Sequence, residues 1–212
     1  MRITSIVIFL LMLGGCENAY YAMQEKFGNL KNDILVDRVE DAMDAQEEAK
    51  EEFKDAYEQF ESVVSVPASE LKSVYKRLND AYEEAQDKAA AVSRRIDSVE
   101  EVAEDLFAEW DAELEMISNA SLRSSSALQL RASRRDFAGL IKAMKRAESR
   151  MEPVLRSFRD HVLFLKHNLN AQAISSLRGE LGGIEADVGR LIQEMERSIS
   201  EAQSFLNTWH KS

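Results

Sequence analysis

The chain has 212 residues, of which 45% are hydrophobic and 31% are charged, and its formal net charge is −11. Helix formers dominate, whereas only two prolines and eight glycines occur, so the composition predicts an almost wholly helical protein. An acidic chain is a poor partner for nucleic acid, and we expect no nucleic-acid binding.

The first segment is typical of an export signal. Arg2 precedes an apolar run, residues 3–13, that is too short for a membrane-spanning helix, which needs about 20 apolar residues. The run ends in Leu13-Gly14-Gly15-Cys16, which resembles the lipobox of bacterial lipoproteins, where the cysteine is lipidated. We therefore predict a lipoprotein signal peptide at residues 1–15 and lipidation of Cys16, the only cysteine. The alternative is an ordinary secretory signal.

Lipidation at Cys16 predicts a membrane anchor, because two or more acyl chains hold a protein stably on a bilayer. In the lipoprotein families that this signal resembles, an aspartate after the cysteine favours retention in the inner membrane. Glu17 therefore favours the outer membrane, facing the periplasm, with the inner membrane as the alternative. We expect residues 16–29 to form an anchor-proximal segment and residues 30–212 a single coiled-coil-rich helical domain.

The first predicted helix has an apolar stripe that advances by alternating threes and fours, which is the pattern of a face buried against partner helices. Its members are Val36, Val39, Met43, Gln46, Lys50, Phe53, Tyr57, Phe60 and Val64, of which Gln46 and Lys50 are polar. Pro67 cannot continue this helix, and Ser69 is the predicted N-cap of the next.

The second predicted helix extends from Glu70 to Ile117. Its stripe is Leu71, Val74, Leu78, Ala81, Ala85, Ala89, Val92, Ile96, Val99, Ala103, Leu106, Trp110, Leu114 and Ile117. The three alanines at 81, 85 and 89 would let a neighbouring helix come close. The stretch 118–121 predicts a turn, because Asn and Ser compete with helical hydrogen bonding.

The third predicted helix begins at Ser121 or Ser125 and extends to Leu169, with a kink at Pro153. Its stripe is Leu130, Phe137, Ile141, Met144, Met151, Leu155, Phe158, Val162, Leu165 and Leu169. The apolar phase changes at Asn168–Asn170, which predicts a turn there. The alternative is a helix that continues through this point.

The last predicted helix has the most regular pattern, with threes and fours alternating over five heptads. Its stripe is Ile174, Leu177, Leu181, Ile184, Val188, Leu191, Met195, Ser198, Ala202, Phe205 and Trp209. Four glycines interrupt it, at 179, 182, 183 and 189, each costing about 1 kcal/mol relative to alanine. We expect them to allow close approach of another helix; the alternative is local flexibility.

Charge is distributed unevenly along the chain. Residues 30–64 and 65–120 each carry a net charge of −8, whereas residues 121–170 carry +7. The simpler interpretation places the basic third helix beside the acidic first and second helices, where opposite charge sets helix order. The alternative is an exposed basic stripe that touches anionic lipid or glycan, formed by Arg131, Arg134, Arg135, Lys142, Lys145, Arg146 and Arg150.

The sequence contains no recognisable catalytic motif. Its histidines, His161, His167 and His210, lack the spacing of a helical metal site and the Glu-x-x-His pattern of di-iron bundles. Acidic clusters at 47–48 and 51–52 could bind calcium loosely, but a solvated helix face is the simpler interpretation. We therefore predict no catalytic, cofactor-binding or metal-binding residues, and no enzyme.

Four stretches resemble a Gram-negative bacterial family of small exported proteins built from one domain of unknown function. They are residues 33–42, 118–123, 151–155 and 163–171. The resemblance covers Tyr20 to Phe205 and implies a helical, coiled-coil-rich domain, often behind a lipoprotein signal. It implies no site residues.

These features predict an all-α protein, an elongated antiparallel four-helix bundle or a set of coiled-coil hairpins. The predicted function is that of a non-enzymatic, membrane-tethered periplasmic lipoprotein. It would serve as a structural or partner-binding component of the cell envelope, with a protein partner or self-association through its helices. One alternative is an amphipathic module that handles lipid or peptide. Another is an enzyme of unrecognised type.

Overall fold

The computed structural model describes residues 16–209, which form four long α-helices and one short 3₁₀ turn. The helices are α1 (Cys16–Val63), α2 (Leu71–Met116), α3 (Ala120–His167) and α4 (Ala171–Trp209), with the 3₁₀ turn η1 (Ala68–Glu70) before α2. The predicted signal peptide, residues 1–15, lies outside the described residues. The segment 16–29 belongs to the same continuous helix as the start of the predicted domain.

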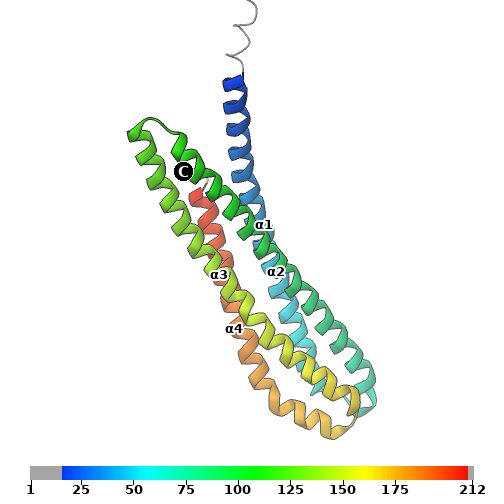
Figure 1. The fold of residues 1–212 in the computed structure, drawn as a ribbon. Coiled ribbons are helices and arrows are strands. Elements are labelled where there is room, and N and C mark those ends of the chain that lie inside the picture. The colour runs from blue at the N-terminus through cyan, green and yellow to red at the C-terminus, as the bar shows by residue number, and fades with distance from the viewer. Residues whose placement is uncertain (1–15, 210–212) are drawn as a thin grey trace, which may run out of the picture.

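The helices form an elongated antiparallel four-helix bundle (Figure 1). Each helix packs on its neighbour in the chain, and α4 closes the ring by packing on α1. The start of α1 and the α2–α3 turn lie at one end, whereas the α1–α2 and α3–α4 turns lie at the other. Of the two predicted architectures, the bundle is therefore the observed one.

The chain turns at all three predicted places, 65–70, 118–121 and 168–170. Asn119 caps α3, because its side chain accepts hydrogen bonds from the backbone N–H groups of Ser121 (3.0 Å) and Leu122 (3.2 Å). The chain breaks at Asn168, whose Nδ2 donates to the carbonyl of Phe164 (2.9 Å), so the continuous-helix alternative is wrong. α3 continues without a break through Pro153.

The predicted N-cap at Ser69 is wrong. Glu70 occupies the cap position of α2 in a helical conformation and makes no side-chain cap bond. The reason is η1, in which the N–H of Glu70 already donates to the carbonyl of Pro67 (2.9 Å). Ser69 therefore lies inside the 3₁₀ turn instead of before the helix.

Only one of the two rows of residues that make up the predicted stripe on α1 is fully buried. Val39, Gln46, Phe53 and Phe60 are buried as predicted. On the other flank the buried residues are Leu35, Ala42, Ala49, Ala56 and Val63, whereas Val36, Met43, Lys50, Tyr57 and Val64 are half-buried. The small alanines face the interior of the bundle, and the larger side chains lie along its edge.

The other three stripes agree more closely with the structure. Every predicted member on α2 is buried except Trp110 and Ile117, which are half-buried near the α2–α3 turn. On α3 the half-buried members are Phe137 and Ile141, and Leu169, placed in that helix by the prediction, lies in the turn and is exposed. On α4 they are Ile174, Leu181 and Trp209.

Aromatic side chains pack in two separate clusters within this core. Phe60 and Phe158 stack with ring centroids 4.6 Å apart, and Phe53 lies 6.3 Å from Phe158, so α1 and α3 meet across the bundle. The second cluster joins α2, α3 and α4 at the end of α4. It consists of Phe107, Phe137, Phe205 and Trp209, with neighbouring centroids 5.0–6.4 Å apart.

The glycines of α4 do not serve close helix approach, so that prediction is wrong. A Cβ atom placed on Gly179, Gly182, Gly183 or Gly189 would meet no atom within 4 Å. Gly179, Gly182 and Gly183 are exposed, because the apolar stripe of α4 turns the opposite face toward the core.

Candidate functional site

The structure does not bring the predicted polar candidates together into a reactive site. His161 lies against Phe60 with its Nδ1 2.6 Å from the carbonyl of Ser157, and His167 ends α3. His210 lies outside the described residues. Within residues 16–209, no group of three or more His, Cys, Asp and Glu side chains could hold a metal ion. Cys16, the predicted lipidation site, is the first residue of α1.

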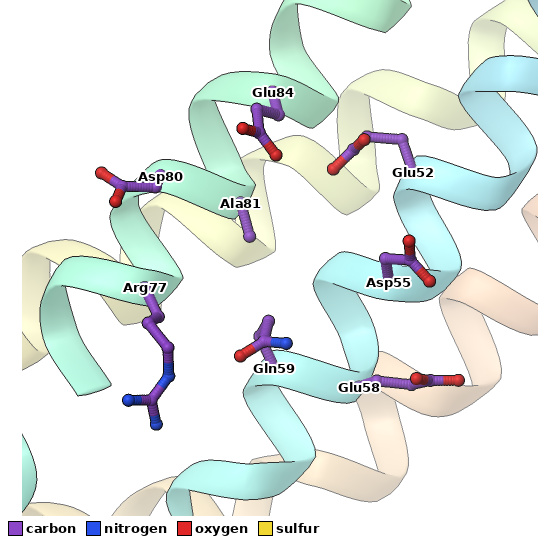
Figure 2. Close-up of a pocket in the computed structure, with 8 residues that line it drawn as sticks. All are labelled: Glu52, Asp55, Glu58, Gln59, Arg77, Asp80, Ala81 and Glu84. Atoms are coloured by element: carbon purple, nitrogen blue, oxygen red, sulfur yellow. The ribbon is translucent and has the colours of Figure 1, made fainter. Parts of the chain in front are cut away.

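A surface groove between α1 and α2 is lined mainly by charged side chains (Figure 2). It has a volume of about 500 Å³ and opens to solvent. Five of its lining side chains are carboxylates and one is a cation, Arg77. The lining residues are Glu52, Asp55, Glu58, Gln59, Arg77, Asp80, Ala81 and Glu84.

The carboxyl groups of Glu52 and Glu84 point toward one another across this groove (Figure 2). Burial raises the pKa of the Glu52 carboxyl above its usual range, and the charges of Glu84 and Asp55 raise that pKa further. Lys88 opposes this shift, because its ammonium favours the ionised form. One turn away, a hydrogen bond from Lys88 lowers the pKa of Glu48.

The groove therefore concentrates negative charge but lacks a nucleophile and a metal-ligand set. Of the four carboxylates in the acidic clusters at 47–48 and 51–52, three form exposed ion pairs and one lines the groove. Glu47, Glu48 and Glu51 are exposed and lie in ion pairs with Lys50, Lys88 and Lys54, at 2.5–3.8 Å. Only Glu52 of these clusters faces the groove.

Sequence patterns did not reveal the groove, because its residues come from two helices whose relative rotation is a tertiary property. The one signal was the run of small residues on α2. Ala81 lines the groove, where a larger side chain would occupy it.

Some basic side chains of α3 form ion pairs with neighbouring helices, as the first interpretation predicts. Others are exposed, as the alternative of an exposed basic stripe requires. Arg134 reaches Asp111 of α2 (2.5 Å), and Lys145 reaches Glu100 of α2 (2.5 Å). Arg146 lies 3.9 Å from Glu194 of α4, so among the described side chains the ion pairs of α3 with other helices go to α2 and α4, and none goes to α1. The other side chains of the predicted stripe are exposed and make no salt bridge within the described residues. They are Arg131, Arg135, Lys142 and Arg150.

Large exposed apolar side chains gather at the two ends of the bundle. Beside the α2–α3 turn, Met116, Leu122 and Leu128 are 48%, 62% and 60% exposed; we call these three residues the proximal end, because α1 begins at this end of the molecule. Beside the α3–α4 turn, the distal end consists of Leu163, Phe164 and Leu169, which are 38–48% exposed.

None of the helices in residues 16–209 is both long enough and apolar enough to cross a membrane. No curated protein and no solved structure matches the chain. One family model does match, over residues 20–209, nearly the range expected from the four motif stretches. The chain therefore belongs to the family described as protein of unknown function (DUF2959).

Proposed function

We propose that this chain is a lipid-anchored protein of the bacterial cell envelope that acts through contacts of its helical rod and not through catalysis. The observation that carries the proposal is the Leu13-Gly14-Gly15-Cys16 sequence directly before the rod. An acyl anchor on Cys16 would connect the bilayer to α1 with no intervening linker, because α1 begins at that residue.

The geometry of the rod supports a role as a spacer. α1 has 48 residues, which at 1.5 Å per residue corresponds to roughly 70 Å of helix. Because the α1–α2 turn lies at the far end from Cys16, an upright rod would hold the distal end roughly that far from the membrane. Leu163, Phe164 and Leu169 would then face a partner in the periplasm.

Lipidation is tested by replacing Cys16 with serine in the full chain and measuring acyl labelling and membrane retention in a Gram-negative host. We expect both to be lost, whereas the neighbouring variant Asn18→Ser should keep both. Separation of inner and outer membranes tests the location that Glu17 favours, the outer membrane. Retention of Cys16→Ser in the membrane fraction would contradict the anchor.

Partner binding is tested by cross-linking in cells from cysteines placed at the distal end, for example Phe164→Cys. A specific protein or glycan should be captured there, and capture should fall at a matched position on the side of the rod, Arg150→Cys. Recovery of only bulk neighbours from both positions would contradict a partner-binding role.

The lipid- or peptide-handling alternative requires the bundle to open, because its buried apolar side chains form one continuous core along the four helices. Native mass spectrometry of the purified lipoprotein distinguishes this alternative from the spacer role. A bound ligand beyond the acyl anchor would favour the alternative, whereas a ligand-free bundle with one cooperative unfolding transition would favour the spacer.

A further inference from the structure

We propose that the proximal end is a second membrane contact, which enters the headgroup layer of the same bilayer that holds the lipid on Cys16. This inference rests on the proposed anchor. It assigns a lipid surface as the partner of Met116, Leu122 and Leu128, and it makes the α2–α3 turn, together with Cys16, a two-point attachment of the rod.

The first observation is that this end of the bundle consists of fewer helices than its middle. α4 ends at Trp209, whose ring packs 6.4 Å from that of Phe107, nine residues before the end of α2. Within the described residues, α4 does not cover α2 and α3 beyond that level. Leu122 and Leu128 are consequently more exposed than any other large apolar side chains described.

The second observation is the position of this end relative to the anchor. Lys31 of α1 pairs with Glu109 of α2 at 2.9 Å, which aligns the two antiparallel helices. α1 therefore reaches the level of Met116 about seven residues closer to its start, which leaves about two helical turns, or roughly 12 Å, up to Cys16. A modest tilt of the rod would bring the turn onto the bilayer surface (Figure 1).

The third observation concerns the backbone and charges of the turn. The Asn119 side chain satisfies the N–H groups of Ser121 and Leu122, which lowers the cost of moving this turn out of bulk water. Arg123, Arg131 and Arg135 are exposed on α3, whereas Glu113 and Glu115 lie on α2. The α3 side therefore suits anionic lipid headgroups, and we expect it to face the bilayer.

The test uses the full lipidated protein in vesicles of phosphatidylethanolamine and phosphatidylglycerol. Because acylation consumes the thiol of Cys16, a fluorophore can be attached at Leu122→Cys, with Leu169→Cys at the distal end as the matched control. Quenchers on the lipid acyl chains should reduce the emission at position 122 roughly threefold more than at position 169. A second label at Leu128→Cys should agree, and charge reversal with Arg131→Glu and Arg135→Glu should weaken its quenching.

Three outcomes would overturn either the second membrane contact or the anchor. Equal, weak quenching at positions 122 and 169 in protein that is membrane-bound overturns the second contact but leaves the anchor intact. Emission at position 122 that is shielded from water, yet not quenched by lipid, shows that a protein segment or a second copy covers this end, and it also overturns the proposal. Protein that is neither acylated nor retained by the vesicles overturns the proposed function itself.

Discussion

Phe158 and Leu122 lie on the same helix, α3, yet Phe158 is fully buried and Leu122 is 62% exposed. Phe158 stands where all four helices surround the core and stacks on Phe60 of α1. Leu122 stands beyond the end of α4, beside a turn. The part of the rod in which four helices enclose the core thus holds the contacts that stabilise the bundle, and we expect the exposed side chains beside the turns to be replaceable without loss of the fold. The following predictions test this division.

The largest effect is expected for Phe158→Ala in the enclosed core, nine residues before the end of α3. Loss of the ring removes its contacts with Phe53 and Phe60 and leaves a cavity, so the free energy of unfolding should fall by about 3–5 kcal/mol. Urea denaturation measures this. The control is Phe164→Ala at the distal end, where the loss should stay below about 1 kcal/mol. Similar losses for the two variants would contradict the division between the enclosed core and the exposed side chains beside the turns.

Gln46→Met is expected to stabilise the fold. Gln46 is fully buried, and neither its amide nitrogen nor its amide oxygen has a hydrogen-bond partner, which is costly. An apolar side chain of similar length should raise the free energy of unfolding by about 1–2 kcal/mol. Gln59→Met, in the groove, serves as the control and should change it by about 0.5 kcal/mol or less. A loss of stability in Gln46→Met would show that the amide specifies the packing of the core.

Glu52 and Glu48 should respond to pH with opposite signs. The pKa of Glu52 is raised in the folded protein, so its ionised form destabilises the fold at neutral pH, and this cost disappears as the pH falls below that pKa. Glu52→Gln should therefore raise the melting temperature at pH 7, by an amount equivalent to about 0.5 kcal/mol or less, and not in acid.

The pKa of Glu48 is lowered by Lys88, so its ionised form stabilises the fold above the ordinary carboxyl pKa, and this contribution is lost in acid. Glu48→Gln should slightly lower the melting temperature at pH 7 and leave it unchanged in acid. The melting temperatures of the two variants, measured at pH 7 and in acid, test both signs. Shifts of the same sign at pH 7 would be inconsistent with the arrangement of charges around the groove.

The smallest change in stability is expected at the two ends. Leu122→Ser and Leu169→Ser should each alter the free energy of unfolding by about 0.5 kcal/mol or less, because both side chains are exposed. The two should nevertheless differ in membrane contact, since only Leu122 lies at the end where α1 begins. A large loss of stability from either variant would show that the ends belong to the folded core after all.

Sequence patterns predicted α2 closely because its stripe is continuous and is bounded by Pro67 and Asn119, both strong local signals. They are less successful on α1, where the spacing of the apolar positions selects the flank that includes Met43 and Tyr57. Met43 and Tyr57 are larger than Ala42 and Ala56, yet the alanines face the core. In a heptad, two adjacent flanks satisfy the same spacing, and only the position of the partner helices selects one of them.

Local sequence signals alone show that the chain is helical, that it turns near residues 65–70, 118–121 and 168–170, and that a lipobox-like stretch precedes the rod. These are local properties, set by propensity, caps and short motifs. The three-dimensional arrangement of the helices was needed to establish which flank of α1 is buried, that the glycines of α4 face away from the core, and that α3 forms ion pairs with α2 and α4. It also decided that Leu122 and Leu128 extend beyond α4 on the side of Cys16, because helix rotation and relative length are set by packing among all four helices.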